Sequence, residues 1–159
     1  MPILAGQSFV ASAVLIAALA TRAPAQRVDS AAVAVAIAKS IVLDMNTRGD
    51  HRGPVFITTS ADSLAPWRVR IVDAIRQADP KQLLTKPIRF GLQLELRGVR
   101  VTDEAIQVQA EYSKCVSAST WNYWGHDVQF VIPHAGGEWQ PQSALIRRMG
   151  DGRCPPDRS

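Results

Sequence analysis

In this chain of 159 residues, His126 is the strongest candidate for a side chain that takes part in a reaction. It lies in a run of alternating apolar residues and shares its parity with Trp124, Val128, Phe130 and Ile132. Alternate side chains of a strand point to the same face, so we expect the His126 imidazole on the apolar face of a sheet. There it could act as a general base, or it could be a core histidine that bonds to the backbone or to Tyr112.

Two classes of function are compatible with these residues. In the first, His126 serves a small pocket enzyme or ligand carrier, with Tyr112 and either Glu111 or Glu95 nearby. In the second, the protein is a noncatalytic binding or assembly module. Its binding surface would then include the aromatic residues late in the chain, Trp121, Tyr123, Trp124 and Trp139, whose alternative role is packing in the core or at its rim. Because no nucleophile motif accompanies His126, we favour the noncatalytic module.

The three histidines do not predict a metal site. His51 lies in a polar loop, and His126 and His134 are about 26 Å apart if the strand between them is regular. One ion could not be held by such a set. The sequence also lacks a glycine-rich phosphate loop and a dinucleotide fingerprint, so neither a metal nor an organic cofactor is expected.

The N-terminal segment is typical of a signal peptide. An apolar run from Phe9 to Ala20 precedes Ala23-Pro24-Ala25, whose small side chains suit cleavage after Ala25. The run is too short for a permanent membrane anchor, and a buried first helix is the alternative. We therefore expect a signal peptide at 1–25, followed by a single periplasmic or secreted domain at 26–159.

Cys115 and Cys154 both lie in the part of the chain that would be exported. An even number of cysteines in an oxidising compartment favours a disulfide bond. A Cys nucleophile paired with His126 is the alternative, but the second cysteine would capture its thiolate. The sequence thus predicts a Cys115–Cys154 bond that ties the C-terminal tail to the sheet.

The net charge of +4 is small for a chain of this length. Its arginines are interspersed with Asp and Glu, whereas a nucleic-acid-binding surface needs clustered positive charge. Nucleic acid is therefore not expected as a partner. A protein or a small ligand is expected as the partner. A homodimer is also compatible with the sequence, because at least one aromatic residue should lie on the outer face of the sheet.

Two helices are predicted before the sheet. The first has apolar residues at a spacing of four, is capped by Asp29 or Ser30, and carries Lys39, Ser40 and Asp44 on its solvent side. A polar loop at 46–53, containing Arg48-Gly49-Asp50 as a solvated turn, leads to a short marginal strand at 54–59 that begins with Pro54. The second helix covers 63–78, with Ser63 as the cap and Pro66 in its first turn.

Residues 88–147 contain four long period-two runs separated by turn residues, a pattern typical of an antiparallel meander. The apolar parity slips by one residue around Arg97-Gly98, which predicts a β-bulge and a bend. The last strand should end near Arg148, followed by a Gly150-Asp151-Gly152 turn. The expected fold is α+β: two helices packed on one curved, cone-like antiparallel sheet of four long strands and a short edge strand.

This element order, with the late sequence HDVQFVIPHAGGEWQPQSALI, resembles the cystatin-like cone fold of the nuclear-transport-factor-2-like superfamily. The resemblance covers residues 30–147 and includes the Gly136-Gly137-Glu138-Trp139 hairpin. That fold hosts isomerases, dehydratases, binding modules and dimerisation domains, so the resemblance implies an architecture and leaves the activity open. Its enzymes usually place Asp or His pairs inside the cone, and His126 is the residue that matches this position.

Overall fold

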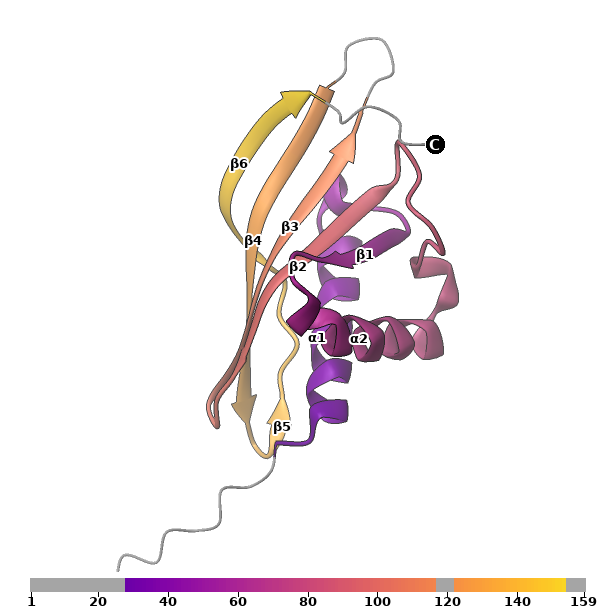
Figure 1. The fold of residues 1–159 in the computed structure, drawn as a ribbon. Coiled ribbons are helices and arrows are strands. Elements are labelled where there is room, and N and C mark those ends of the chain that lie inside the picture. Colours follow the sequence, from indigo (N-terminus) through magenta and orange to yellow (C-terminus); the bar gives the residue numbers. More distant parts are fainter. Residues whose placement is uncertain (1–27, 117–121, 154–159) are drawn as a thin grey trace, which may run out of the picture.

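The computed structural model describes the backbone of residues 28–116 and 122–153, and the side chains in those ranges except at 122, 123 and 151–153. The predicted signal peptide lies outside the described residues. The long elements are α1 (Ser30–Thr47), β1 (Val55–Thr59), α2 (Ala65–Ala78), β2 (Leu92–Val101), β3 (Ala105–Cys115), β4 (Asn122–Ala135), β5 (Glu138–Trp139) and β6 (Leu145–Arg153). Both helices lie on the concave side of one curved sheet (Figure 1), which confirms the α+β class.

The sheet differs from the prediction at its two edges. β1 pairs with β2 in parallel, so the sheet is mixed, whereas β2, β3 and β4 pair in antiparallel order as expected. The last predicted run is divided into β5, which pairs with the end of β4, and β6, which pairs with the first half of β4. The Gly150–Gly152 segment lies inside β6 and is not a turn, because it continues the ladder opposite Tyr123–Gly125.

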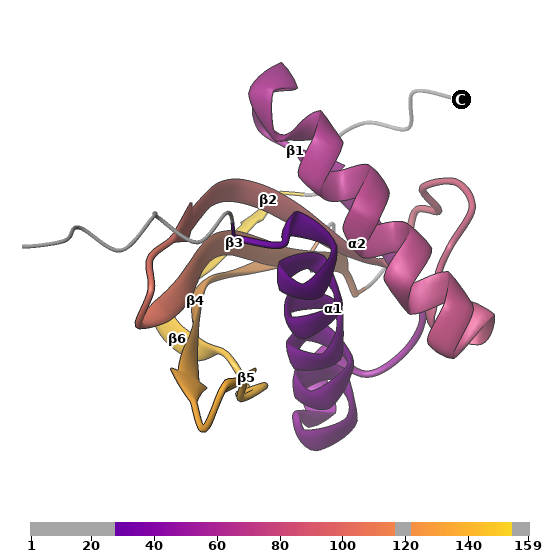
Figure 2. The same cartoon turned by 90° about the horizontal axis from the view of Figure 1, so that it is seen from below.

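The predicted bend in β2 is confirmed. Its register with β3 shifts between Leu96 and Gly98, which leaves Arg97 as the extra residue of a bulge. Before the bulge Leu92, Leu94 and Leu96 are buried on the concave face, and opposite them are Ala110 and Tyr112 of β3. The sheet therefore curves around α1, and Figure 2 shows α1 along the concave face with α2 beside it.

α1 begins where the sequence predicts, because the Asp29 carboxylate accepts a hydrogen bond from the Ala31 amide. By length and composition alone this helix is apolar enough to cross a membrane, but half of that window is buried inside the protein, as in a core helix. Lys39 is exposed, whereas Ser40 and Asp44 are fully buried, so their predicted place on the solvent side is wrong. The β5–β6 connection lies over them: the Gln142 amide bonds to Ser40 Oγ and the Ala144 amide to the Asp44 carboxylate.

α2 follows a short 3-10 turn at Asp62–Leu64. Its N-cap is Leu64, which makes no side-chain capping bond, so the predicted cap at Ser63 is wrong. Pro66 does occupy the first turn, where its missing amide hydrogen costs nothing. Ile71 and Ile75 are buried, and this face holds α2 against α1 and over β1.

Candidate functional site

Asp44, His51 and His126 form a hydrogen-bonded chain that we call the histidine relay. His51 Nδ1 lies 2.6 Å from Asp44 Oδ2, and His51 Nε2 lies 3.0 Å from His126 Nδ1. Asp44 and His51 are fully buried, and His126 is 7% exposed. The relay thus joins the last turns of α1, the 3-10 turn Gly49–His51 and the first half of β4.

The position of His126 on the inner face is confirmed, and His51, which was not among the predicted partners, is one of its polar partners. Tyr112 lies opposite His126 in the β3–β4 ladder, and among the described residues His126 Nδ1 lies within hydrogen-bonding distance of His51 Nε2. The sequence predicts His51 in a polar loop, and the structure buries it between Asp44 of α1 and His126 of β4. The sequence predicts that the three histidines lie apart, whereas His51 and His126 lie within hydrogen-bonding distance of each other.

The Asp44 carboxylate is held in its charged form. Burial alone would raise its pKa, but hydrogen bonds from His51, Arg48 and the Ala144 amide outweigh burial and lower the pKa below its usual value. Arg48 Nε donates to Asp44 Oδ1 at 2.8 Å, and the Arg48 guanidinium also donates to the Ala144 carbonyl. The Arg48 guanidinium therefore compensates the buried negative charge of Asp44.

This arrangement sets the positions of the relay hydrogens. A carboxylate only accepts, so His51 Nδ1 carries a hydrogen toward Asp44. If His51 is neutral, its Nε2 is an acceptor, and His126 Nδ1 must donate to it. His126 Nε2 would then be the basic atom of the relay, the arrangement in which a general base is oriented by a carboxylate and a second imidazole.

Aromatic side chains enclose the relay. Tyr112 stacks on His51 with ring centroids 4.0 Å apart, and Trp124 lies 4.5 Å from His126 by the same measure. Burial raises the pKa of the Tyr112 phenol well above its usual value, and the nearby Asp44 charge adds to this effect. Among the described residues, the Tyr112 hydroxyl is a buried side-chain group that has no hydrogen-bond partner.

Glu95 and Glu111, the carboxylates proposed to assist His126, are not near it. Both lie on the convex face, where Arg97 pairs with Glu95, Glu111 and Asp127. Their residue numbers are odd, and in this part of β2 and β3 the odd residues point away from the helices. The structure therefore replaces the predicted glutamate partner with Asp44, which acts through His51.

The aromatic residues predicted to bind a partner fall into separate places. Trp124 is half-buried beside His126, and Trp139 is half-buried beside His134 at the other end of β4. Trp121 and the side chain of Tyr123 lie outside the described residues. Cys115 is buried at the end of β3, and Cys154 also lies outside, so their disulfide stays a prediction.

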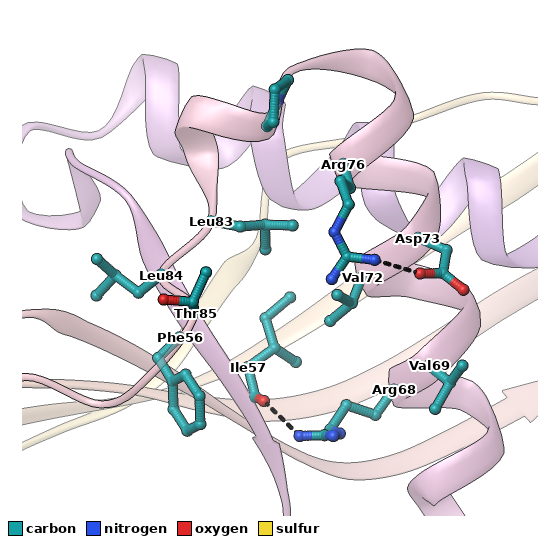
Figure 3. A pocket seen from close by; sticks show the side chains of 11 residues that line it. Phe56, Ile57, Arg68, Val69, Val72, Asp73, Arg76, Leu83, Leu84 and Thr85 are labelled. Carbon is teal, nitrogen blue, oxygen red and sulfur yellow. Dashed lines mark hydrogen bonds and ion pairs between the residues drawn. The ribbon is translucent and has the colours of Figure 1, made fainter.

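A second site lies at the edge of the sheet, and we call it the β1-edge pocket. It has a volume of about 370 Å³ and lies between α2, β1 and the segment 80–85. Apolar residues from all three elements line it (Figure 3): Phe56, Ile57, Val69, Val72, Leu83 and Leu84. The same pocket is bordered by Arg68, Asp73 and Arg76, which come from α2.

The polar groups of this pocket differ in their partners. Arg76 is paired with Asp73 at 2.6 Å. Arg68 makes no ion pair with any described residue, and its guanidinium reaches the Ile57 carbonyl only at the long distance of 3.5 Å. The pocket therefore combines apolar walls with a cation whose charge is not balanced by a described carboxylate.

Of the two sites, the sequence predicts only the inward position of His126 in the relay, and it does not predict the β1-edge pocket. Predicting the relay would have required knowing that Asp44 and His51 are buried. The signal available in the sequence was the row of polar residues beside the apolar face of the first helix. The β1-edge pocket needed the contact between residue 55 and residue 83, which no local pattern encodes. Among the described residues, no three His, Cys, Asp or Glu side chains are grouped to hold a metal ion.

Comparison of the chain with protein-family models, with curated proteins and with solved structures gives no match. The function must therefore be argued from the two sites themselves.

Proposed function

We propose that this protein is an exported, noncatalytic binding domain whose ligand site is the β1-edge pocket. The observation that carries the proposal is the composition of that pocket: apolar walls on three elements and an arginine, Arg68, without an ion pair among the described residues. Ligand sites are usually concave, mainly apolar and furnished with a few polar groups that fix orientation. Export is supported by the small-residue cleavage pattern before Gln26.

The histidine relay has a structural role in this proposal. It connects Asp44 of α1, His51 of the following turn and His126 of β4, and Asp44 also holds the connection to β6 through the Ala144 amide. A satisfied buried polar network of this kind fixes one arrangement of the elements that it joins. The relay thus stabilises the sheet and α1, while the ligand binds at the opposite edge strand.

The proposal is tested with 4-methylpentanoate, a branched apolar chain with one carboxylate. We expect saturable shifts of the Ile57, Val72 and Leu84 amide resonances when the ¹⁵N-labelled protein is titrated. Val69→Glu should weaken binding about tenfold or more, because it puts a carboxylate on the apolar wall of the pocket. Val69 is 52% exposed, so the substitution should leave the fold intact.

The matched control is Val35→Glu, which places the same carboxylate on an exposed valine of α1 and should leave the affinity unchanged. Shifts that do not saturate, or that are equal in Val69→Glu and the wild type, would remove the β1-edge pocket as the ligand site.

A second candidate function is supported by the Asp44–His51–His126 geometry. His126 would act as a general base whose imidazole is oriented by His51 and, through it, by Asp44. The resemblance to cone-fold enzymes implies Asp or His pairs inside the cone, and these residues supply such a set. Diethyl pyrocarbonate tests this role: His126 should be modified quickly in the wild type and at least about tenfold more slowly in Asp44→Asn. Equal rates, or no modification of His126, would leave the relay with its structural role alone.

A further inference from the structure

We infer that the β1-edge pocket receives the carboxyl end of an extended peptide, which adds as a short antiparallel strand to the open edge of β1. The inference rests on the proposed binding function and names the class of its ligand. It is carried by three features: the backbone groups that β1 leaves at its edge, the position of Arg68, and the apolar walls.

Among the described residues, β1 is the terminal strand of the sheet, and the side that it leaves open follows from the hydrogen bonds that it already makes. The Ser60 amide bonds to Leu96 of β2, whereas the Val55 carbonyl accepts from the Leu84 amide on the other side. The amide and carbonyl of one residue point to the same side of a strand, and successive residues alternate. The amide and carbonyl groups of the even-numbered residues of β1 therefore point toward β2, and those of Ile57 and Thr59 point away from it.

The start of this edge is already covered. Val55 forms a parallel bridge with Leu83, so the chain at 83–84 runs beside the first residue of β1. A peptide that binds beside Ile57 and Thr59 could not extend past Ile57, because Leu84 occupies the next position along the edge of β1. The occupant must therefore end there, which favours a chain terminus over the middle of a strand.

The charge of Arg68 indicates which terminus of the peptide lies next to Leu84. Arg68 lies at the Ile57 carbonyl, at the point where the added strand would end, and no described carboxylate neutralises it. A terminal carboxylate could accept from the Arg68 guanidinium and from the Ile57 amide, whereas a terminal ammonium would be repelled. With its carboxyl end next to Leu84, the peptide runs antiparallel to β1.

The residues that line the β1-edge pocket indicate the type of side chain at the C-terminal position of the peptide. Val69 and Val72 come from α2, and Leu83 and Leu84 from the opposite side, so the hollow between them is apolar. A branched apolar side chain at the peptide terminus would replace water there. The predicted ligand is thus a peptide with an apolar last residue and a free carboxyl group.

The test uses a fluorescein-labelled hexapeptide, Gly-Ser-Thr-Val-Thr-Leu, in its free-acid and carboxamide forms. Fluorescence anisotropy with the purified protein should show tighter binding of the free acid by about tenfold or more. Arg68→Gln should weaken binding of the free acid by the same factor and abolish the difference between the two forms. Arg70→Gln, an exposed arginine two residues away on the same helix, should change neither affinity.

A third peptide, N-methylated at the amides that would bond to β1, tests strand addition and should bind at least about tenfold more weakly. Equal affinity for acid and amide, or for the methylated and unmethylated peptides, would overturn the inference. If the hexapeptide binds no more tightly than 4-methylpentanoate, the peptide ligand is wrong while the pocket remains a binding site. If neither compound binds, the proposed function falls with it.

Discussion

Replacing Asp44 with Asn should reverse the hydrogens of the histidine relay. Asp44 Oδ1 accepts from Arg48 Nε and from the Ala144 amide, and both of these groups can only donate. The Asn oxygen must therefore stay at this position, and its NH₂ group must point to His51. His51 Nδ1 would then accept, its Nε2 would donate, and His126 Nδ1 would change from donor to acceptor.

The expected cost in stability follows from the lost charge. Breaking a buried ion pair by removing one partner typically costs about 3–5 kcal/mol. The Arg48 side chain is 35% exposed and can be partly solvated in the variant, so the value should lie near the lower end, at about 3 kcal/mol. Asp73→Asn is the control: its pair with Arg76 has side chains 50% and 59% exposed and should contribute at most about 1 kcal/mol.

The pH dependence gives a second measurement. Because the pKa of folded Asp44 is lowered from its usual value of 3.8, the unfolded chain binds more protons in the interval between the two values. The stabilisation is complete above 3.8 and is lost as the pH falls through the folded value. Asp44→Asn should lack this component of acid destabilisation.

Urea unfolding at neutral pH and imidazole ¹⁵N chemical shifts would measure these effects. The wild type should show hydrogens on Nδ1 of both His51 and His126, and the variant should show them on Nε2. The reasoning would be refuted by an Asp44→Asn protein as stable as Asp73→Asn, or by the same imidazole shifts in variant and wild type.

Three further perturbations test other parts of the molecule. Tyr112→Phe should be neutral or stabilise the protein by up to about 1 kcal/mol in urea unfolding, because the hydroxyl is buried without a partner among the described residues; destabilisation by more than that would reveal a hydrogen bond. Arg97→Gln should cost about 1 kcal/mol at low salt and less at high salt, since it leaves three carboxylates together on the convex face; a salt-independent cost would contradict this account. Protein from an exported fraction should have the intact mass of a chain that begins at Gln26, and Cys115→Ser should cost about 2–4 kcal/mol if its bond to Cys154 forms; retention of Met1 or two titratable thiols would refute these predictions.

The sheet interior was predictable because its pattern is local. Period-two alternation correctly places His126, Phe130 and Ile132 on the buried face, and the slip in parity correctly locates the bulge at Arg97. Each of these inferences needs only a few consecutive residues, and the strand geometry does the rest. The last strand was harder, because β6 is an edge strand whose exposed Arg147, Arg148 and Met149 carry no alternation.

The candidate sites depend on contacts that the sequence does not mark. Asp44 and Ser40 lie beside the apolar face of α1, and such flanking polar residues are usually solvated. What buries them is the β5–β6 connection, which returns about a hundred residues later and offers the amides of Gln142 and Ala144. His51 was misplaced for the same reason, since its burial follows from that of Asp44.

The position of the relay explains why a polar network is placed in an otherwise apolar core. Among the described strands, β6 pairs with β4 alone, on the half of β4 that contains His126, and its register shifts between Asp127 and Val128. An edge strand with an irregular register is weakly specified by its own ladder. Asp44 fixes the chain just before β6 through Ala144, and His51 connects the same carboxylate to β4. One buried charge therefore anchors both the edge strand and the strand that it pairs with, and replacing it with an apolar residue would remove the positional information along with the charge.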